Sequence, residues 1–256
     1  MGRGGGGVAA ATTTTKQNKN DPLPFLSPPQ AANRGPARYV ELDLPDVVSR
    51  KAATVRGDAR LAAAVGGALP PRAASISTSA YSVLPIDLRS SAAVLAALDG
   101  AGIDRAAPTL ILAECVLVYL PPTASAALAF ALATHLADAA VLVFEPVRPD
   151  DPFGRQMVSN VAARGSPLLG LAATRTLADH EARWKEAGWD RAAAISMAAA
   201  WAGCVEPGGR RRAEAAARLD EVEEWRLLLD HYAFVLAVRG AGGVCAGLGW
   251  RSYGGG

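Results

Sequence analysis

The stretch from Leu110 to Pro121 constrains the fold of this chain more than any other. It reads LILAECVLVYLP, an apolar run whose one acid is Glu114. Such a run is typical of a parallel strand, because helices cover both faces of a parallel sheet. We therefore predict a strand over Thr109–Tyr119. Burying an unpaired carboxylate is costly, so we expect Glu114 near the carboxyl end of this strand, where open α/β sheets bind ligands.

Strands and helices are predicted to alternate along the rest of the chain. The apolar patterns indicate strands over 39–44, 81–87, 141–145 and 234–239, and helices over 46–55, 92–100, 121–137, 152–164, 177–187 and 212–232. Residues 57–78 read as an irregular insertion, and Pro85 predicts an edge or a bent end for the second strand. Strands that alternate with helices favour a parallel sheet with right-handed crossovers, so the predicted class is α/β.

Charge, cysteine and histidine content narrow the possible functions. Lys and Arg number 26 against 24 Asp and Glu, a balance that gives no reason to expect nucleic acid or a membrane as a partner. The three cysteines are odd in number and widely spaced, which argues against disulfides or a zinc site and favours a reducing compartment. The three histidines lack metal-ligand spacing. We expect a cytoplasmic monomer without a bound metal.

Three acids stand where predicted strands give way to loops: Asp43, Asp87 and Glu114. In a doubly wound sheet these strand ends line one crevice. Asp43 suits a ribose, because its two oxygens accept both hydroxyl protons. Asp87 and Leu88 suit an adenine amine and ring, and Glu114 suits an ammonium group. Together these groups describe S-adenosyl-L-methionine. Taken singly, Asp43 and Asp87 are better explained as helix caps or solvated charges.

Four blocks of the sequence resemble the leucine carboxyl methyltransferase family. They read YVELDLPDVVSRK, YSVLPIDLR, TLILAECVLVYLPP and FEPVRPDDPFGRQM, and their order and spacing match from about Tyr39 to Arg239. The resemblance implies a class I, Rossmann-like methyltransferase sheet with a helical cap and S-adenosyl-L-methionine as cofactor. It also implies the catalytic subunit of protein phosphatase 2A as partner, methylated on its C-terminal leucine. The family's cofactor-binding positions fall on Asp43, Asp87, Leu88 and Glu114.

The N-terminal part of the chain departs from the pattern of that family. The family places a helical lid, a strand and a glycine-rich GxGxD-type loop before the block that begins here at Tyr39. Residues 1–36 are instead of low complexity, and we expect them to be a disordered extension. A methyltransferase-like domain over 37–240 and a Gly-rich tail over 241–256 follow. Because the missing strand is central in the family's sheet, the resemblance implies an N-terminally incomplete fold with a hole in its core.

Methyl transfer to a carboxylate needs no general base, since the carboxylate is already ionised at neutral pH. Proximity and orientation would then supply most of the catalysis. The catalytic candidates are Tyr119 and Arg155, which could anchor the substrate carboxylate, with Arg89 as a further donor and Glu145 in a supporting role. A surface ion pair with a neighbouring aspartate is the stronger interpretation of Arg155.

Two other functions compete with this one. A related methyltransferase would act on a small carboxylic acid or a modified nucleoside. A non-catalytic binding protein would keep the partner surface without the cofactor, and the missing glycine-rich loop favours it. A nicotinamide-dependent dehydrogenase would need a GxGxxG turn, which Asp43 alone cannot replace.

Overall fold

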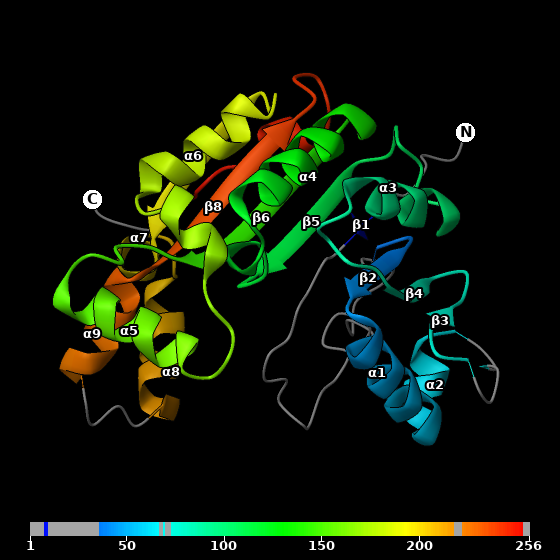
Figure 1. The fold of residues 1–256 in the computed structure, drawn as a ribbon, viewed down its shortest axis with the longest axis horizontal. Helices are drawn as coiled ribbons and strands as arrows, with labels where there is room; N and C mark the ends of the chain where they lie inside the picture. Colours follow the sequence, from blue (N-terminus) through cyan, green and yellow to red (C-terminus); the bar gives the residue numbers. More distant parts are fainter. Residues whose placement is uncertain (1–7, 10–35, 67–68, 70–72, 218–221, 253–256) are drawn as a thin grey trace.

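The computed structural model describes residues 8–9, 36–66, 69, 73–217 and 222–252. Its strands are β1 (Val8–Ala9), β2 (Tyr39–Asp43), β3 (Ile76–Ser77), β4 (Tyr81–Pro85), β5 (Thr109–Glu114), β6 (Ala139–Pro146), β7 (Arg191–Ser196) and β8 (Tyr232–Arg239). Its helices are α1 (Pro45–Gly57), α2 (Ala59–Ala64), α3 (Ser91–Gly100), α4 (Pro122–His135), α5 (Pro152–Ala162), α6 (Leu177–Glu186), α7 (Met197–Gly203), α8 (Pro207–Ala217) and α9 (Val222–Asp230). Short 3-10 turns are η1 (Leu117–Tyr119), η2 (Leu169–Ala173) and η3 (Cys245–Gly247). The alternation of strands and helices confirms the predicted α/β class (Figure 1).

The strands form two groups that meet at β1. The first has the order β1-β2-β4-β3, with β1, β2 and β4 parallel and β3 antiparallel to β4. Strand β1 pairs with β2 and also contacts β5, so it lies between the two groups. This is the position at which the family resemblance implies a missing central strand. Apart from β1 and residue 36, the predicted disordered extension over 1–36 lies outside the described residues.

The second group has the order β5-β6-β8-β7, and of its hydrogen-bonded pairs in the described ranges β5–β6 alone is parallel. Strand β8 runs antiparallel to both β6 and β7, so the prediction of a parallel sheet is wrong for this part of the chain. Strand β7 was not predicted at all. Its sequence, RAAAIS, has little β-branched character, and it is a strand because its backbone pairs with β8.

Three predicted boundaries are also wrong. The strand predicted over Thr109–Tyr119 ends at Glu114, because Cys115 takes a left-handed backbone conformation with φ of 47° and η1 follows. The apolar residues of η1 are buried, so burial rather than strand structure explains the long apolar run. Helices α8 and α9 replace the single helix predicted over 212–232. The predicted irregular insertion over 57–78 contains α2 and β3.

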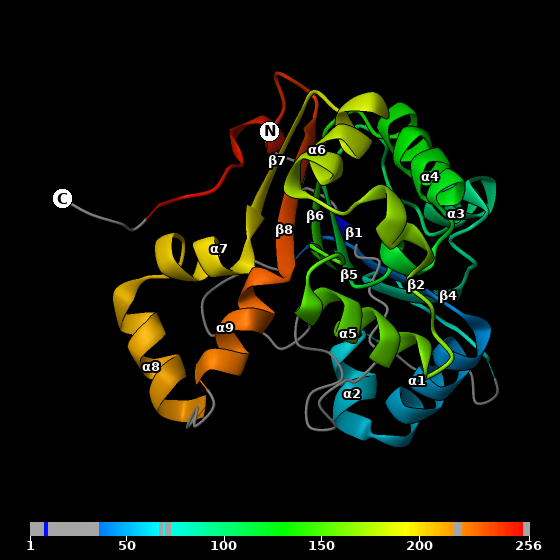
Figure 2. The ribbon, with the colours of Figure 1, turned by 60° about the vertical axis from the view of Figure 1, so that its left-hand side comes forward.

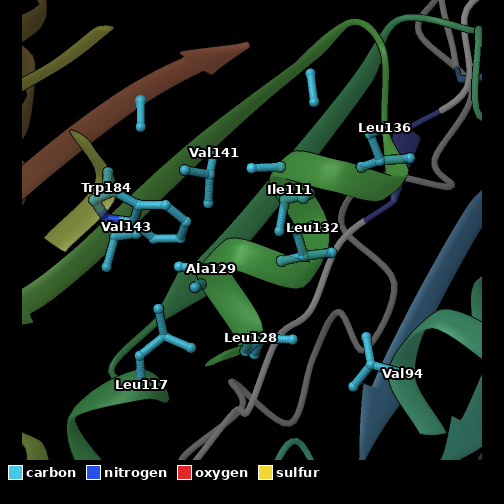
Figure 3. Packing of buried hydrophobic residues seen from close by; sticks show 14 of the residues in the cluster. Val94, Ile111, Leu117, Leu128, Ala129, Leu132, Leu136, Val141, Val143 and Trp184 are labelled. Carbon is cyan, nitrogen blue, oxygen red and sulfur yellow. The ribbon is translucent and has the colours of Figure 1, made fainter. Parts of the chain in front are cut away.

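Helices cover the two faces of the strands unequally. Helices α3, α4 and α6 lie along one face, where they bury a large apolar cluster against β2, β5 and β6 (Figure 2). Figure 3 shows side chains of α4 facing those of β5 and β6, with Trp184 of α6 beside Val143. Helix α1 covers the opposite face of β2 and β4, where it buries a smaller cluster around Tyr39 and Tyr81. On that side of β6 and β8, Cys245 and Trp250 of the tail provide the packing.

The larger cluster is incompletely filled. A cavity of about 40 Å³, lined almost wholly by apolar side chains, lies where β2 and β5 face α3 and α4. Val40 and Leu42 of β2 line one side of it and Ile111 and Ala113 of β5 another. Its walls are therefore the two strands that flank β1. None of the helices in the described ranges is long and apolar enough to cross a membrane.

Among the glycines of the described ranges, Gly154 leaves a Cβ atom the least room. A Cβ at this position, in the first turn of α5, would lie 2.0 Å from the carbonyl oxygen of Arg148. Because backbone cannot rotate away as a side chain can, we expect Gly154→Ala to destabilise the protein by about 1–3 kcal/mol. Urea unfolding would measure this. Gly57→Ala is the control, since nothing lies within 4 Å of its Cβ, and it should leave stability unchanged or raise it by up to about 1 kcal/mol. Equal losses in the two variants would contradict the prediction.

Candidate functional site

A cavity of about 460 Å³ lies at the carboxyl ends of β2 and β4 and beside the turn that follows β5. Its volume falls within the range of roughly 300–1,000 Å³ that is common for small-molecule sites. The residues that line it include Asp43, Asp87, Leu88, Arg89 and Tyr119. The structure thus brings three of the four predicted cofactor-binding residues and one of the two predicted catalytic residues into one cavity.

Asp43 ends β2 and is 6% exposed. One carboxylate oxygen, Oδ1, accepts a hydrogen bond of 2.7 Å from the backbone N–H of Leu44. No described residue donates a hydrogen bond to the other oxygen, Oδ2. Burial, with a smaller effect of nearby Glu41, raises the pKa of Asp43 above its ordinary value. Among the described residues the second oxygen of Asp43 thus has no donor, and a hydroxyl-bearing ligand could supply one.

Asp87 and Leu88 reach the same cavity because the segment after β4 is tied to the end of β2. The N–H of Ile86 donates a hydrogen bond of 2.9 Å to the carbonyl oxygen of Asp43. Leu88 is buried and offers an apolar surface. Asp87 accepts hydrogen bonds from the backbone and guanidinium of Arg89, which lower the pKa of Asp87. Asp87 therefore pairs locally with Arg89 and does not cap α3, whose N-cap is Ser90, and it also lines the cavity.

Glu114 is the last residue of β5, and its side chain is exposed. It does not line the cavity. The predicted position at the end of a strand is correct, because β5 ends there. Side chains alternate along a strand, so Glu114 projects to the same face as Leu112, which packs against the cluster around Tyr39. Tyr39 and Asp43 share a face of β2 by the same rule. Asp43 and Glu114 thus project to the same side of the fold.

The two predicted catalytic residues are far from equivalent. Tyr119 belongs to η1, is half-buried and lines the cavity. Burial raises the pKa of Tyr119, so its hydroxyl stays a donor at neutral pH. Arg155 is exposed on α5, donates a hydrogen bond to the carbonyl oxygen of Asp150 and does not line the cavity. Arg89, the further donor considered, is exposed and lies in the cavity wall, paired with Asp87.

Some residues of the cavity wall gave no signal in the sequence. Ser166, Pro167 and Leu169 come from the segment after α5, and Leu169 is 49% exposed. Nothing in their local pattern indicates a site, because the tertiary fold alone brings them opposite the ends of β2 and β4. Within the described ranges, no group of three or more histidine, cysteine, aspartate or glutamate residues could hold a metal ion.

Comparison with known proteins decides the family. A protein of Arabidopsis thaliana described as a leucine carboxyl methyltransferase 1 homolog is 35% identical over 224 residues, which are 87% of this chain and 68% of that protein. The chain belongs to the leucine carboxyl methyltransferase family. The sequence model of that family matches residues 28–133. The human tRNA wybutosine-synthesizing protein 4 is 37% identical over 203 residues, which are 78% of this chain but only 30% of that protein.

Solved structures place this member of the leucine carboxyl methyltransferase family among class I, Rossmann-like folds. A DUF574 family protein from Streptomyces avermitilis matches with a TM-score of 0.52 and 13% identity, over 91% of this chain and 75% of that one. A protein from Thermobifida fusca described as a methyltransferase matches with a TM-score of 0.51 and 15% identity, over 80% of this chain and 64% of that one. Family and fold are therefore those of a methyltransferase, as the sequence predicts.

Proposed function

We propose that this chain binds S-adenosyl-L-methionine and transfers its methyl group to the C-terminal leucine carboxylate of the protein phosphatase 2A catalytic subunit. Membership of the leucine carboxyl methyltransferase family supports the reaction. The observation that carries the proposal is the shared cavity of Asp43, Asp87 and Leu88. These residues bring together a carboxylate with one oxygen that no described residue engages, a second acid and a buried apolar surface.

The residues present fit the cofactor. Asp43 would accept hydrogen bonds from the ribose hydroxyls, Asp87 would accept one from the adenine amine, and Leu88 would pack on the ring. Glu114 would pair with the ammonium group from its exposed position at the end of β5. When bound, the cofactor supplies an electrophilic methyl group. The chain's own residues would orient the substrate and exclude water, which together can contribute several kcal/mol to catalysis.

Tyr119 is the residue of the cavity best suited to anchor the substrate carboxylate. Its protonated hydroxyl can donate one hydrogen bond without removing the negative charge that attacks the methyl group. We expect Tyr119→Phe to lower kcat/KM by roughly tenfold, the usual value of one hydrogen bond to a charged group. The affinity for S-adenosyl-L-methionine should stay within about threefold of wild type, and equal losses in both quantities would contradict this role. Arg155→Met is the matched control and should change neither, because Arg155 lies outside the cavity.

A transfer assay tests the proposed reaction. The chain would be incubated with methyl-labelled S-adenosyl-L-methionine and a peptide that ends in the phosphatase sequence, either as a free leucine carboxylate or as a carboxamide. The proposal predicts label on the carboxylate peptide alone. A parallel reaction contains tRNA in place of the peptide, because the similarity to tRNA wybutosine-synthesizing protein 4 makes a modified nucleoside the second candidate substrate. Label on both peptides would overturn the proposal. Label on tRNA and on neither peptide would also overturn it.

A further inference from the structure

Glu145 and Arg183 form an ion pair in the interior of the fold. Glu145, near the end of β6, is fully buried, and the side chain of Arg183 on α6 is 8% exposed. The Arg183 guanidinium donates a hydrogen bond of 3.2 Å to Oε2 of Glu145. Burial raises the pKa of Glu145, and Arg183 opposes that rise. A buried ion pair of this kind is a poor source of stability compared with apolar packing, so its geometry calls for another explanation.

The second oxygen of Glu145 holds the turn that follows β5. Its Oε1 accepts a hydrogen bond of 2.6 Å from the backbone N–H of Val118, the middle residue of η1. Arg183 also donates a hydrogen bond of 3.4 Å to Oγ of Ser125 in α4. The pair thus connects β6, α6, α4 and η1. Because Val118 is 1% exposed, no solvent can replace Glu145 as acceptor of its N–H.

Turn η1 is also a wall of the proposed cofactor cavity. Tyr119, the last residue of the turn, lines that cavity together with Val116 and Leu120 on either side of it. The turn starts two residues after Cys115, whose left-handed backbone follows the end of β5. Leu117 of η1 packs in the large apolar cluster, and the bond from Val118 to Glu145 ties the backbone of the turn to β6.

From this geometry we propose that Glu145, held by Arg183, is a positioning residue that fixes η1 and thereby sets where Tyr119 stands in the cavity. This inference rests on the proposed function for its effect on the cofactor, but the anchoring of η1 can be measured without any ligand. Glu145 itself touches neither the cavity nor a reacting group.

Two double variants separate the hydrogen bond to Val118 from the ion pair. Glu145→Gln with Arg183→Met removes both charges and keeps an oxygen that accepts from the N–H of Val118. Glu145→Met with Arg183→Met removes both charges and the acceptor. Neither leaves a lone buried charge, and folded proteins commonly tolerate the loss of both partners of a buried ion pair. Leu229→Ala is the control for a general loss of stability, because Leu229 is buried in α9, away from the cavity. Each variant would be examined by hydrogen exchange over residues 115–121 and by titration with S-adenosyl-L-methionine.

We expect the variant Glu145→Met with Arg183→Met to exchange on the order of tenfold faster over residues 115–121 and to lose affinity by a similar factor. Glu145→Gln with Arg183→Met, and Leu229→Ala, should stay within about threefold of wild type in both measurements. Wild-type exchange and affinity in Glu145→Met with Arg183→Met would overturn the proposal, as would equal damage in Glu145→Gln with Arg183→Met. If wild type itself binds no cofactor, the proposed function fails, and the exchange rates alone decide whether Glu145 anchors the turn.

Discussion

Replacing Asp43 by asparagine is expected to weaken the binding of S-adenosyl-L-methionine by roughly 10- to 150-fold. This range corresponds to the loss of about 1.5–3 kcal/mol for a hydrogen bond to a charged group. The amide has nearly the same shape as the carboxylate, and its oxygen can still accept from the N–H of Leu44. What it loses is the charged oxygen that no described residue engages. Isothermal titration of wild type and variant measures the difference.

The stability of the same variant separates a binding role from a structural one. Burial raises the pKa of Asp43 in the folded protein, so the folded state holds the proton more tightly than the unfolded state does. The stability that this group contributes is present below its ordinary pKa of 3.8 and is lost as the pH rises through the folded value. At pH 7, Asp43→Asn should therefore unfold at the same urea concentration as wild type or a higher one.

Asp46→Asn is the matched control for Asp43. Asp46 lies three residues further on, in the first turn of α1, where it is exposed and outside the cavity. Its substitution should leave the affinity for the cofactor unchanged. If both asparagine variants bind the cofactor as wild type does, Asp43 does not hold the ribose. If Asp43→Asn unfolds at a lower urea concentration than wild type at pH 7, the Asp43 carboxylate stabilises the fold.

Trp184→Ala is expected to cost about 3–5 kcal/mol of stability, the usual loss for a large aromatic removed from a core. Trp184 is 1% exposed and packs edge-on against Trp189, with ring centroids 5.2 Å apart. It also lines the apolar cavity of about 40 Å³ in the core, so its removal would enlarge a space that is already unfilled. A loss of this size is a large part of the 5–15 kcal/mol that is typical of a whole domain.

Trp201→Ala provides the comparison for Trp184. Trp201 makes a similar edge-on contact, 5.1 Å from Trp225, but it is only partly buried, where α7 packs on α9. We expect its removal to cost on the order of 1 kcal/mol, close to the average for single substitutions. Urea unfolding of both variants tests the difference. A smaller loss for Trp184 than for Trp201 would show that the cluster between the strands and α4 is not the main core.

Local patterns predicted the positions of most strands because apolar runs and turn residues mark them directly. They also brought Asp43, Asp87 and Leu88 together correctly, since the rule that parallel strands end at one edge needs no side-chain detail. Local patterns could not predict the direction of a strand. Strand β8 has an ordinary apolar pattern, and its pairing shows that it runs antiparallel to β6.

The environment of individual side chains was the hardest feature to predict. The apolar run around Glu114 predicted a strand that continues to Tyr119, but the left-handed backbone of Cys115 ends the strand at Glu114, whose side chain is exposed. The partner of Glu145 could not be found in the sequence, because Arg183 lies 38 positions away on a helix with several other charged residues. Such contacts depend on how α6 packs against β6.

The most direct test of the central claim is the titration of the wild-type chain with S-adenosyl-L-methionine. If the cavity of Asp43, Asp87 and Leu88 holds the adenosyl group, the titration should show saturable heat with one site per chain, and Asp43→Asn should weaken it. A folded wild-type sample that gives no heat at millimolar cofactor would contradict the account.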